Sequence, residues 1–189
     1  MTQAVLLDLL ETDLRQILDT FRNDIATLDE AALKFRPAEG EWNILECLAH
    51  LNAYSDLYIP RIQSAIHKAK ARKWTPGDDV KYAWGAKRAI KRVGAENGKF
   101  YKAKKSFNYI GQNLDKGALK VFAINTEKIL RNIQLAREVD LNKPSFQRGK
   151  SRFFSFTLGN TFEWLVAHSK RHLLQMEAVV TRMQTMQLV

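Results

Sequence analysis

The chain has 189 residues, of which 46% are hydrophobic, and its formal net charge is +10. This length suits a single domain (residues 1–189) that buries about 70% of its unfolded surface, so the core needs neither a disulfide nor a structural metal. No run approaches the roughly 18 apolar residues of a membrane span, and the N-terminal stretch lacks the basic leader of a secretory signal. The single cysteine, Cys47, forms no internal disulfide. We therefore expect a cytoplasmic protein with no membrane segment.

The positive charge is concentrated in one segment. Residues 61–105 contain fourteen Lys and Arg but only three acidic residues, whereas the rest of the chain is close to neutral. Such a local excess raises the question of a polyanionic partner such as nucleic acid.

Apolar residues at helical spacing predict a first helix over about residues 3–27, with Thr2 as its N-cap. A second helix is expected to begin after Asn43, a favourable N-cap, and to run to about residue 70, with Pro60 as an irregularity inside it. The apolar face expected on the first helix comprises Val5, Leu6, Leu9, Leu10, Leu14, Ile17, Leu18, Phe21 and Ile25.

Glycines and prolines then interrupt every helical pattern over residues 72–115. A connection of this length favours a crossover between helices that are not antiparallel neighbours, and part of it can form turns or a short helix. A third helix is predicted over about 116–138, and a fourth over 158–183 after a connection whose SRFFSFTL stretch can be extended. Four helices with little strand signal predict an all-α fold, a four-helix bundle with a long basic connection between helices 2 and 3.

Three of the four histidines occupy inward-leaning positions on two predicted long helices. His168 and His172 are four residues apart on the fourth helix, so their side chains share one face, and His50 lies beside the stripe of the second helix. Three neutral imidazoles that leave open positions suit zinc, nickel or ferrous iron, which would activate a bound water or thiol. The alternative is that these histidines only hydrogen-bond neighbours in the core. The low histidine total and the placement on two helices favour the metal site.

Other polar residues are weaker candidates. His67 stands in a charged run and is expected to be solvated, whereas Cys47 shares a face with His50 and is more often a core residue than a neighbour of a metal. Glu46, Arg171 and Gln175 lie close to the histidines in the sequence. Each of them either orients an imidazole ring or faces solvent, and the sequence leaves both interpretations open. No carboxylate is identified as a general base, so the catalytic residues stay unassigned.

The stretches EWNILECLAHL (41–51) and TLGNTFEWLVAHSKRHLLQ (157–175) resemble the DinB/YfiT-like superfamily of metal-dependent enzymes. The matching positions are Trp42, Asn43, Glu46, His50 and Leu51 in the first stretch, and His168, Arg171, His172 and Gln175 in the second. The resemblance implies a bundle in up-down-down-up order, a metal held by the three histidines, and frequent dimerisation. Relatives of this kind include transferases that attach bacillithiol or mycothiol to electrophiles, a mycothiol-dependent isomerase and proteins with proposed hydrolase activity.

Three functional hypotheses follow. The first is a metal-dependent hydrolase or thiol S-transferase, in which a divalent metal on the three histidines activates a water or a low-molecular-weight thiol towards a small-molecule substrate. The second is a non-catalytic module whose segment 61–105 binds nucleic acid or another polyanion, although a solvated loop packed on the bundle by its aromatic residues is favoured over it. The aromatic residues concerned are Trp74, Tyr82, Trp84, Phe100 and Tyr101. The third is a bundle with a vestigial metal site and a structural or regulatory role.

Overall fold

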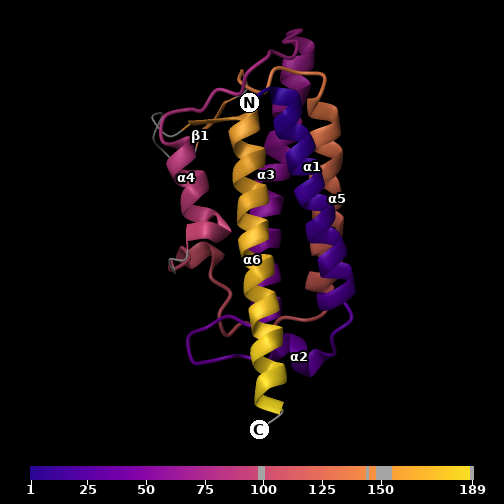
Figure 1. Cartoon of the computed structure of the whole chain (residues 1–189), viewed down its shortest axis with the longest axis vertical. Helices are drawn as coiled ribbons and strands as arrows, with labels where there is room; N and C mark the ends of the chain where they lie inside the picture. Colours follow the sequence, from indigo (N-terminus) through magenta and orange to yellow (C-terminus); the bar gives the residue numbers. More distant parts are fainter. Residues whose placement is uncertain (98–100, 144, 148–154, 188–189) are drawn as a thin grey trace.

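The computed structural model describes residues 1–97, 101–143, 145–147 and 155–187, and four long helices dominate it. They are α1 (Gln3–Thr20), α3 (Ile44–Ala71), α5 (Gly117–Ala136) and α6 (Leu158–Gln187). The mostly helical fold expected from the sequence is confirmed. In Figure 1 the chain descends along α1, ascends along α3 and α5, and descends along α6. Helices α1 and α3 each pack against both α5 and α6, so the four helices enclose one core.

The two N-caps expected from the sequence are both present. Thr2 accepts a hydrogen bond from the Val5 amide at 3.2 Å, which satisfies one of the free N–H groups at the start of α1. Asn43 and Glu46 form a reciprocal capping box at the start of α3. Helix α3 continues through Pro60 to Ala71, close to the predicted end.

The first helix is more irregular and less buried than its pattern suggests. Its last part, Phe21–Ile25, is a π-helical turn, and a short helix α2 (Glu30–Lys34) follows. Val5 and Leu9 were expected on the apolar face, but they are 46% and 54% exposed. The prediction for these two residues is wrong because, within the described part of the chain, α1 makes its main contacts with the long helices α5 and α6, which cover a narrower stripe than the sequence offers.

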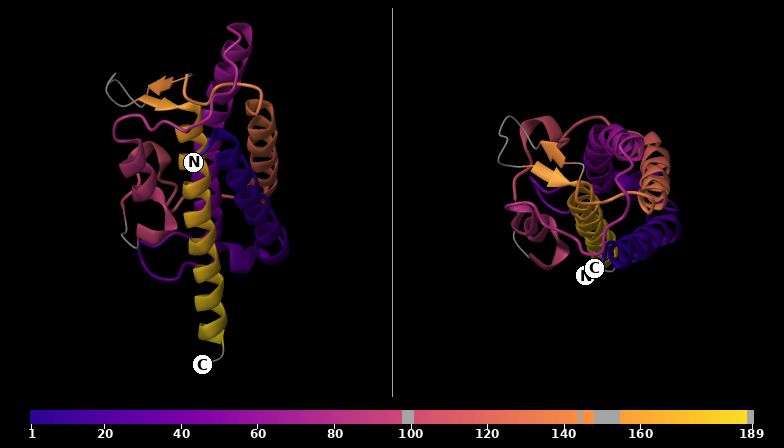
Figure 2. Two further views of the ribbon diagram at one scale, coloured as in Figure 1. Left: turned by 45° about the horizontal axis from the view of Figure 1, so that its top comes forward. Right: turned by 90° about the horizontal axis from the view of Figure 1, so that it is seen from above.

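The long connection between α3 and α5 is folded onto the bundle. It contains the short helix α4 (Ala86–Val93) and two single turns, Ala95–Asn97 and Lys105–Phe107. Helix α4 lies beside α6, outside the group of four long helices (Figure 2). Asn160 of α6, which is fully buried, accepts from the Ala83 amide at 3.0 Å and donates to the Lys81 carbonyl at 3.3 Å. These bonds attach the connection to the outer side of α6.

Two short strands, β1 (Ser145–Gln147) and β2 (Ser155–Thr157), pair antiparallel just before α6. The extended conformation that the sequence permits for this stretch is therefore present over 155–157, while residues 151–154 lie outside the described part of the chain. None of the helices in the described ranges combines the length and the apolarity that crossing a bilayer requires.

Candidate metal centre

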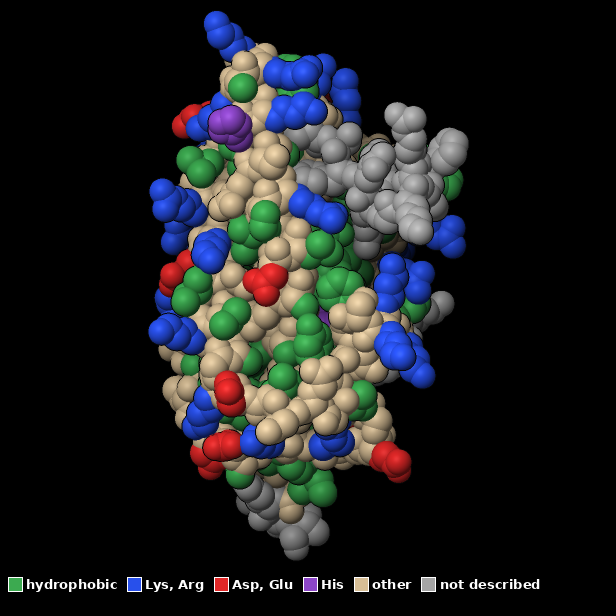
Figure 3. All heavy atoms as spheres, turned by 180° about the vertical axis from the view of Figure 1, so that it is seen from behind, with side chains coloured by type: hydrophobic (Ala, Val, Ile, Leu, Met, Phe, Trp, Pro, Cys, Tyr) green, Lys and Arg blue, Asp and Glu red, His purple; other side chains and the backbone are tan. Residues whose placement is uncertain are grey.

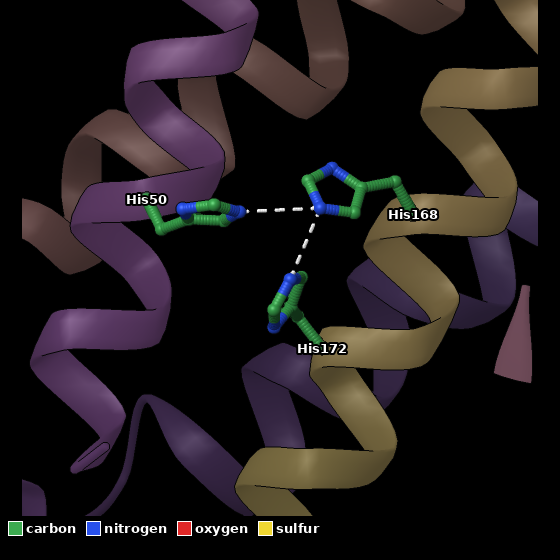
Figure 4. A group of neighbouring side chains, drawn as sticks. All are labelled: His50, His168 and His172. Atoms are coloured by element: carbon green, nitrogen blue, oxygen red, sulfur yellow. Dashed lines mark hydrogen bonds between the residues drawn. The ribbon is translucent and has the colours of Figure 1, made fainter. Parts of the chain in front are cut away.

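The three histidines from the two helical stripes meet in the interior of the molecule. His50 projects from α3, and His168 and His172 project from successive turns of α6 (Figure 4). The Nε2 atom of His168 lies 3.2 Å from Nε2 of His50 and 3.1 Å from Nε2 of His172. All three residues are buried, with 4 to 8% of their surface exposed. Two helices that are far apart in sequence thus direct three ring nitrogens at one small volume.

The opposite ring nitrogens of two of these histidines are held by carbonyl oxygens. His50 Nδ1–H donates to the backbone carbonyl of Phe107 at 2.6 Å, and His172 Nδ1–H donates to the side-chain oxygen of Gln175 at 2.9 Å. Because a carbonyl oxygen only accepts, Nδ1 carries the proton in both neutral rings and Nε2 keeps its lone pair. Gln175 therefore orients the His172 ring, which is one of the two roles considered for it from the sequence.

The spacing of the Nε2 atoms fits a divalent metal. Metal–nitrogen bonds of about 2.1 Å at neighbouring coordination positions separate the nitrogens by roughly 3.0–3.4 Å, and the two distances from His168 Nε2 fall in this range. Two lone pairs repel each other at such a distance unless a proton or a cation lies between them. The described residues therefore offer a donor set that a metal ion satisfies.

Burial keeps the imidazoles of His50 and His172 neutral. It lowers the pKa of His50, against a smaller opposite effect of the Phe107 carbonyl. It also lowers the pKa of His172 to about 3, with His50 and the guanidinium of Arg171 adding to the effect of burial and Gln175 opposing it. The neutral imidazole is the form that binds metal, so these two rings are ready for a cation near pH 7 without first releasing protons.

Aromatic rings enclose the cluster. The Trp42 ring lies 4.8 Å from that of His50 and stacks at 5.8 Å on that of His172. Tyr54 and Trp164 each place their ring 4.9 Å from the ring of His168. Tyr54 and Trp164 were not among the site residues predicted from the sequence. The signal was present, because each lies four residues from a histidine on the same helix and so shares its face.

The cluster is not completely closed. Seen from behind (Figure 3), a histidine side chain is visible in a narrow recess at mid-height, bordered by hydrophobic side chains. Lysine and arginine side chains lie to one side of this recess. The small exposed fractions of the clustered histidines agree with an opening of this kind.

Two residues close to His50 in the sequence have structural roles. Glu46 was expected to orient an imidazole or to face water, and both readings are wrong. Its buried carboxylate accepts from the amides of Asn43 at 2.9 Å and Gly111 at 2.6 Å and pairs with Arg36 at 2.6 Å. Cys47 is fully buried, and burial raises the pKa of its thiol far above the ordinary value. It is therefore an unreactive core residue, as expected from the sequence.

The remaining candidates lie outside the cluster. His67 is exposed, as expected. Arg171 donates to the carbonyl of Arg92 at 3.3 Å, in the last turn of α4, and its guanidinium lies 5.8 Å from the ring of Tyr101. Arg171 thus holds the end of α4 against α6. This role differs from both hypotheses considered for it, orienting an imidazole ring and facing solvent.

Comparison with known proteins bears on this geometry. The family model of the DinB superfamily matches residues 13–176, which include α3 and all three clustered histidines. No curated protein and no solved structure matches the chain. The family match extends over most of the 189 residues, and the chain therefore belongs to the DinB superfamily.

Proposed function

We propose that this protein is a metal-dependent enzyme in which His50, His168 and His172 bind a divalent zinc, nickel or iron ion. The reaction class is hydrolysis or thiol S-transfer to a small-molecule electrophile. One observation carries the proposal: the Nε2 atom of His168 lies 3.2 and 3.1 Å from those of His50 and His172, the ligand atoms of all three lie within 4.8 Å of one another, and two of the rings are fixed by carbonyl oxygens on Nδ1. Histidines that merely filled a core would need no such convergence.

The residues of the chain prepare the site in three ways. The Phe107 carbonyl and Gln175 keep protons on Nδ1 and so aim lone pairs inward. The aromatic enclosure excludes bulk water and lowers the local dielectric constant, which strengthens charge interactions there. When bound, a divalent ion supplies a Lewis acid that lowers the pKa of a bound water or thiol.

No carboxylate of the described residues belongs to the cluster. The cluster therefore provides no carboxylate base for a nucleophile that must transfer its proton to the protein. A thiol or a water that ionises near neutral pH needs little more than the metal. A low-molecular-weight thiol cosubstrate is consistent with this arrangement.

We also propose a four-helix bundle in one domain, a homodimer and a cytoplasmic location. The course of α1, α3, α5 and α6 in Figure 1 supports a bundle in up-down-down-up order within one domain. Homodimerisation and a cytoplasmic location are carried over from the sequence and from the family resemblance.

Metal analysis of untagged protein tests the proposal. We expect about one zinc, nickel or iron ion per chain, and we expect His172→Ala to lose it. The exposed histidine provides the control, because His67→Ala should keep the metal content of the wild type. Metal-loaded protein should then accelerate either thiol conjugation or ester hydrolysis. Wild-type protein without stoichiometric metal, or full metal content in His172→Ala, would contradict the proposal.

The outer face of α4 supports polyanion binding as a second candidate. Its four cations, Lys87, Arg88, Lys91 and Arg92, are all exposed, and the neighbouring Trp84 is 75% exposed. Trp74 and Tyr82, by contrast, pack against the core, as expected for a connection fixed to the bundle by its aromatic residues. Phe100 lies outside the described residues. Retention on a single-stranded DNA column that falls steeply with salt would support this candidate, and absence of retention at moderate salt would exclude it.

A further inference from the structure

The turn 105–111 belongs to the long connection, yet it touches the histidine cluster and the helix that carries His50. The Phe107 carbonyl accepts the Nδ1 proton of His50 at 2.6 Å. The Phe107 ring stacks on Tyr54 at 4.2 Å with an interplanar angle of 17°. The Gly111 amide donates to Glu46 at 2.6 Å. A short stretch of chain is thus attached to α3 on both sides of its bond to His50.

The attachment through Gly111 ends on a rigid group. The Glu46 carboxylate is fully buried and is also held by the Asn43 amide and by Arg36. Glu46 precedes His50 by one helical turn, so the distance between the Glu46 anchor and the His50 ring is set by helix geometry. The Phe107 carbonyl is therefore held in a fixed relation to the ring that it orients.

We propose that the turn 105–111 positions His50 and so determines how tightly the centre binds its metal. This inference rests on the proposed metal-binding function. Loss of the group that orients a metal-bound histidine typically weakens metal binding about 10-fold to 100-fold, because the free ring adopts other tautomers and orientations. By thermodynamic linkage, metal binding must in turn stabilise the attached turn.

Two glycines of the connection provide a matched test. Gly111 and Gly85 both have φ of +75°, and a Cβ added at either position would meet no atom within 4 Å. Alanine therefore introduces the same backbone strain at both positions. Gly85 precedes α4, whereas Gly111 anchors the turn next to His50. We expect Gly111→Ala to weaken metal binding about 10-fold and Gly85→Ala to leave it unchanged.

The aromatic contact provides a second pair of variants. Phe107→Ala keeps the carbonyl but removes the ring that stacks on Tyr54, and we expect it to weaken metal binding about 10-fold. Trp84→Ala removes an exposed aromatic ring from the same connection and should have no effect on metal binding. Affinities for Zn²⁺ and Co²⁺ are measured by competition with a chromophoric chelator. The absorption spectrum of the Co²⁺ form reports the coordination geometry independently of any enzymatic assay.

Limited trypsin digestion tests the linkage in wild-type protein. Lys102, Lys104 and Lys105 are exposed and lie at the edge of the turn. Saturation with Zn²⁺ should slow cleavage after these lysines several-fold, but not cleavage after Lys73, which is also exposed and lies at the other end of the connection. In His172→Ala the metal should have no effect on either rate.

The outcomes separate this inference from the proposed function. If wild-type protein binds no divalent metal, both are wrong. If wild-type protein binds metal but Gly111→Ala and Phe107→Ala bind it equally well, and metal does not slow cleavage at the turn, the positioning role alone is wrong. Circular dichroism identifies any variant that has not folded, and in that case the digestion of wild-type protein decides the matter.

Discussion

The two helices that carry the histidines support them in different ways. On α6, His172 is oriented by Gln175, a residue three positions further along the same helix. On α3, His50 is oriented by the carbonyl of Phe107, which is 57 residues away in the sequence and belongs to a connection. The hydrogen bond that orients His172 is therefore complete once one helix forms. The α3 side is complete only when the connection has folded across it.

This difference has a consequence for stability and function. Support from within a helix costs little additional ordering, because helix formation has already fixed the backbone. Support from a connection costs chain entropy, because the connection must be ordered first. Contacts that the connection makes with the rest of the protein have to offset this cost. The bonds of Asn160 to the connection, together with those of Glu46, supply such contacts. Perturbations of the connection should therefore act on His50 before they act on His172.

The largest expected effect comes from removing the buried anchor. Glu46→Ala leaves the amides of Asn43 and Gly111 without their acceptor, and it leaves Arg36 without its ion-pair partner, although Arg36 still donates to the Glu41 carbonyl. We expect a loss of about 3 kcal/mol in the free energy of unfolding, the lower end of the range for breaking a buried ion pair, because Arg36 is partly exposed. Urea denaturation measures this loss.

A surface ion pair is the control for this substitution. Glu127 pairs with Arg22 at 2.6 Å, and both side chains are about half exposed. Glu127→Ala should cost less than about 1 kcal/mol. Similar losses for Glu46→Ala and Glu127→Ala would show that the carboxylate of Glu46 does not anchor the start of α3.

The second effect is a pH dependence of stability that comes from His50 and His172. Burial lowers the pKa of His50, and lowers that of His172 to about 3, whereas an unfolded histidine titrates near 6.5. Below about pH 6.5 the unfolded chain therefore binds more protons than the folded chain. The free energy of unfolding of metal-free protein should fall with decreasing pH, by up to about 1.4 kcal/mol per pH unit for each ring.

Substitutions assign this slope to the individual rings. Between about pH 6 and 4.5, His172→Asn should flatten the dependence, because the titration of His172 in the folded state lies well below this window. Urea denaturation of chelator-treated protein at several pH values measures the slopes. An unchanged slope in His172→Asn would mean that this ring is protonated in the folded protein, contrary to a buried neutral imidazole.

The same contrast between local and distant support explains which parts of the site were predictable. His168 and His172 follow from a spacing of four on one helix, and the stripe of α3 indicates His50. Gln175 could be named as a candidate because it lies one turn from His172. The same spacing of four residues places Tyr54 on the face of His50 and Trp164 on the face of His168, although these two residues were not assigned to the site.

The contribution of Phe107 could not be predicted in this way. A backbone carbonyl carries no signature in the sequence, and the connection that presents it has no periodic pattern. Glu46 was misjudged for a related reason. Its position suggested a role towards His50, but the capping box at Asn43 and the amide of Gly111 bind its carboxylate instead. Local rules describe the helices well, whereas contacts across a long connection depend on the folded path.

The smallest expected effect concerns the support of His172 from within α6. Gln175→Ala removes the acceptor of the Nδ1 proton, and we expect metal binding to weaken about 10-fold, with little loss of stability because the side chain lies on an established helix. Gln175→Glu keeps an acceptor at this position and should retain the affinity, whereas Gln16→Ala, at an exposed position of α1, is the control. Chelator competition with Zn²⁺ compares the three variants. Because Gln175 is held by its own helix, Gln175→Ala should leave tryptic cleavage of metal-free protein after Lys104 unchanged, in contrast to Gly111→Ala, which should accelerate it. Faster cleavage in both variants would mean that the two sides of the centre are not supported independently.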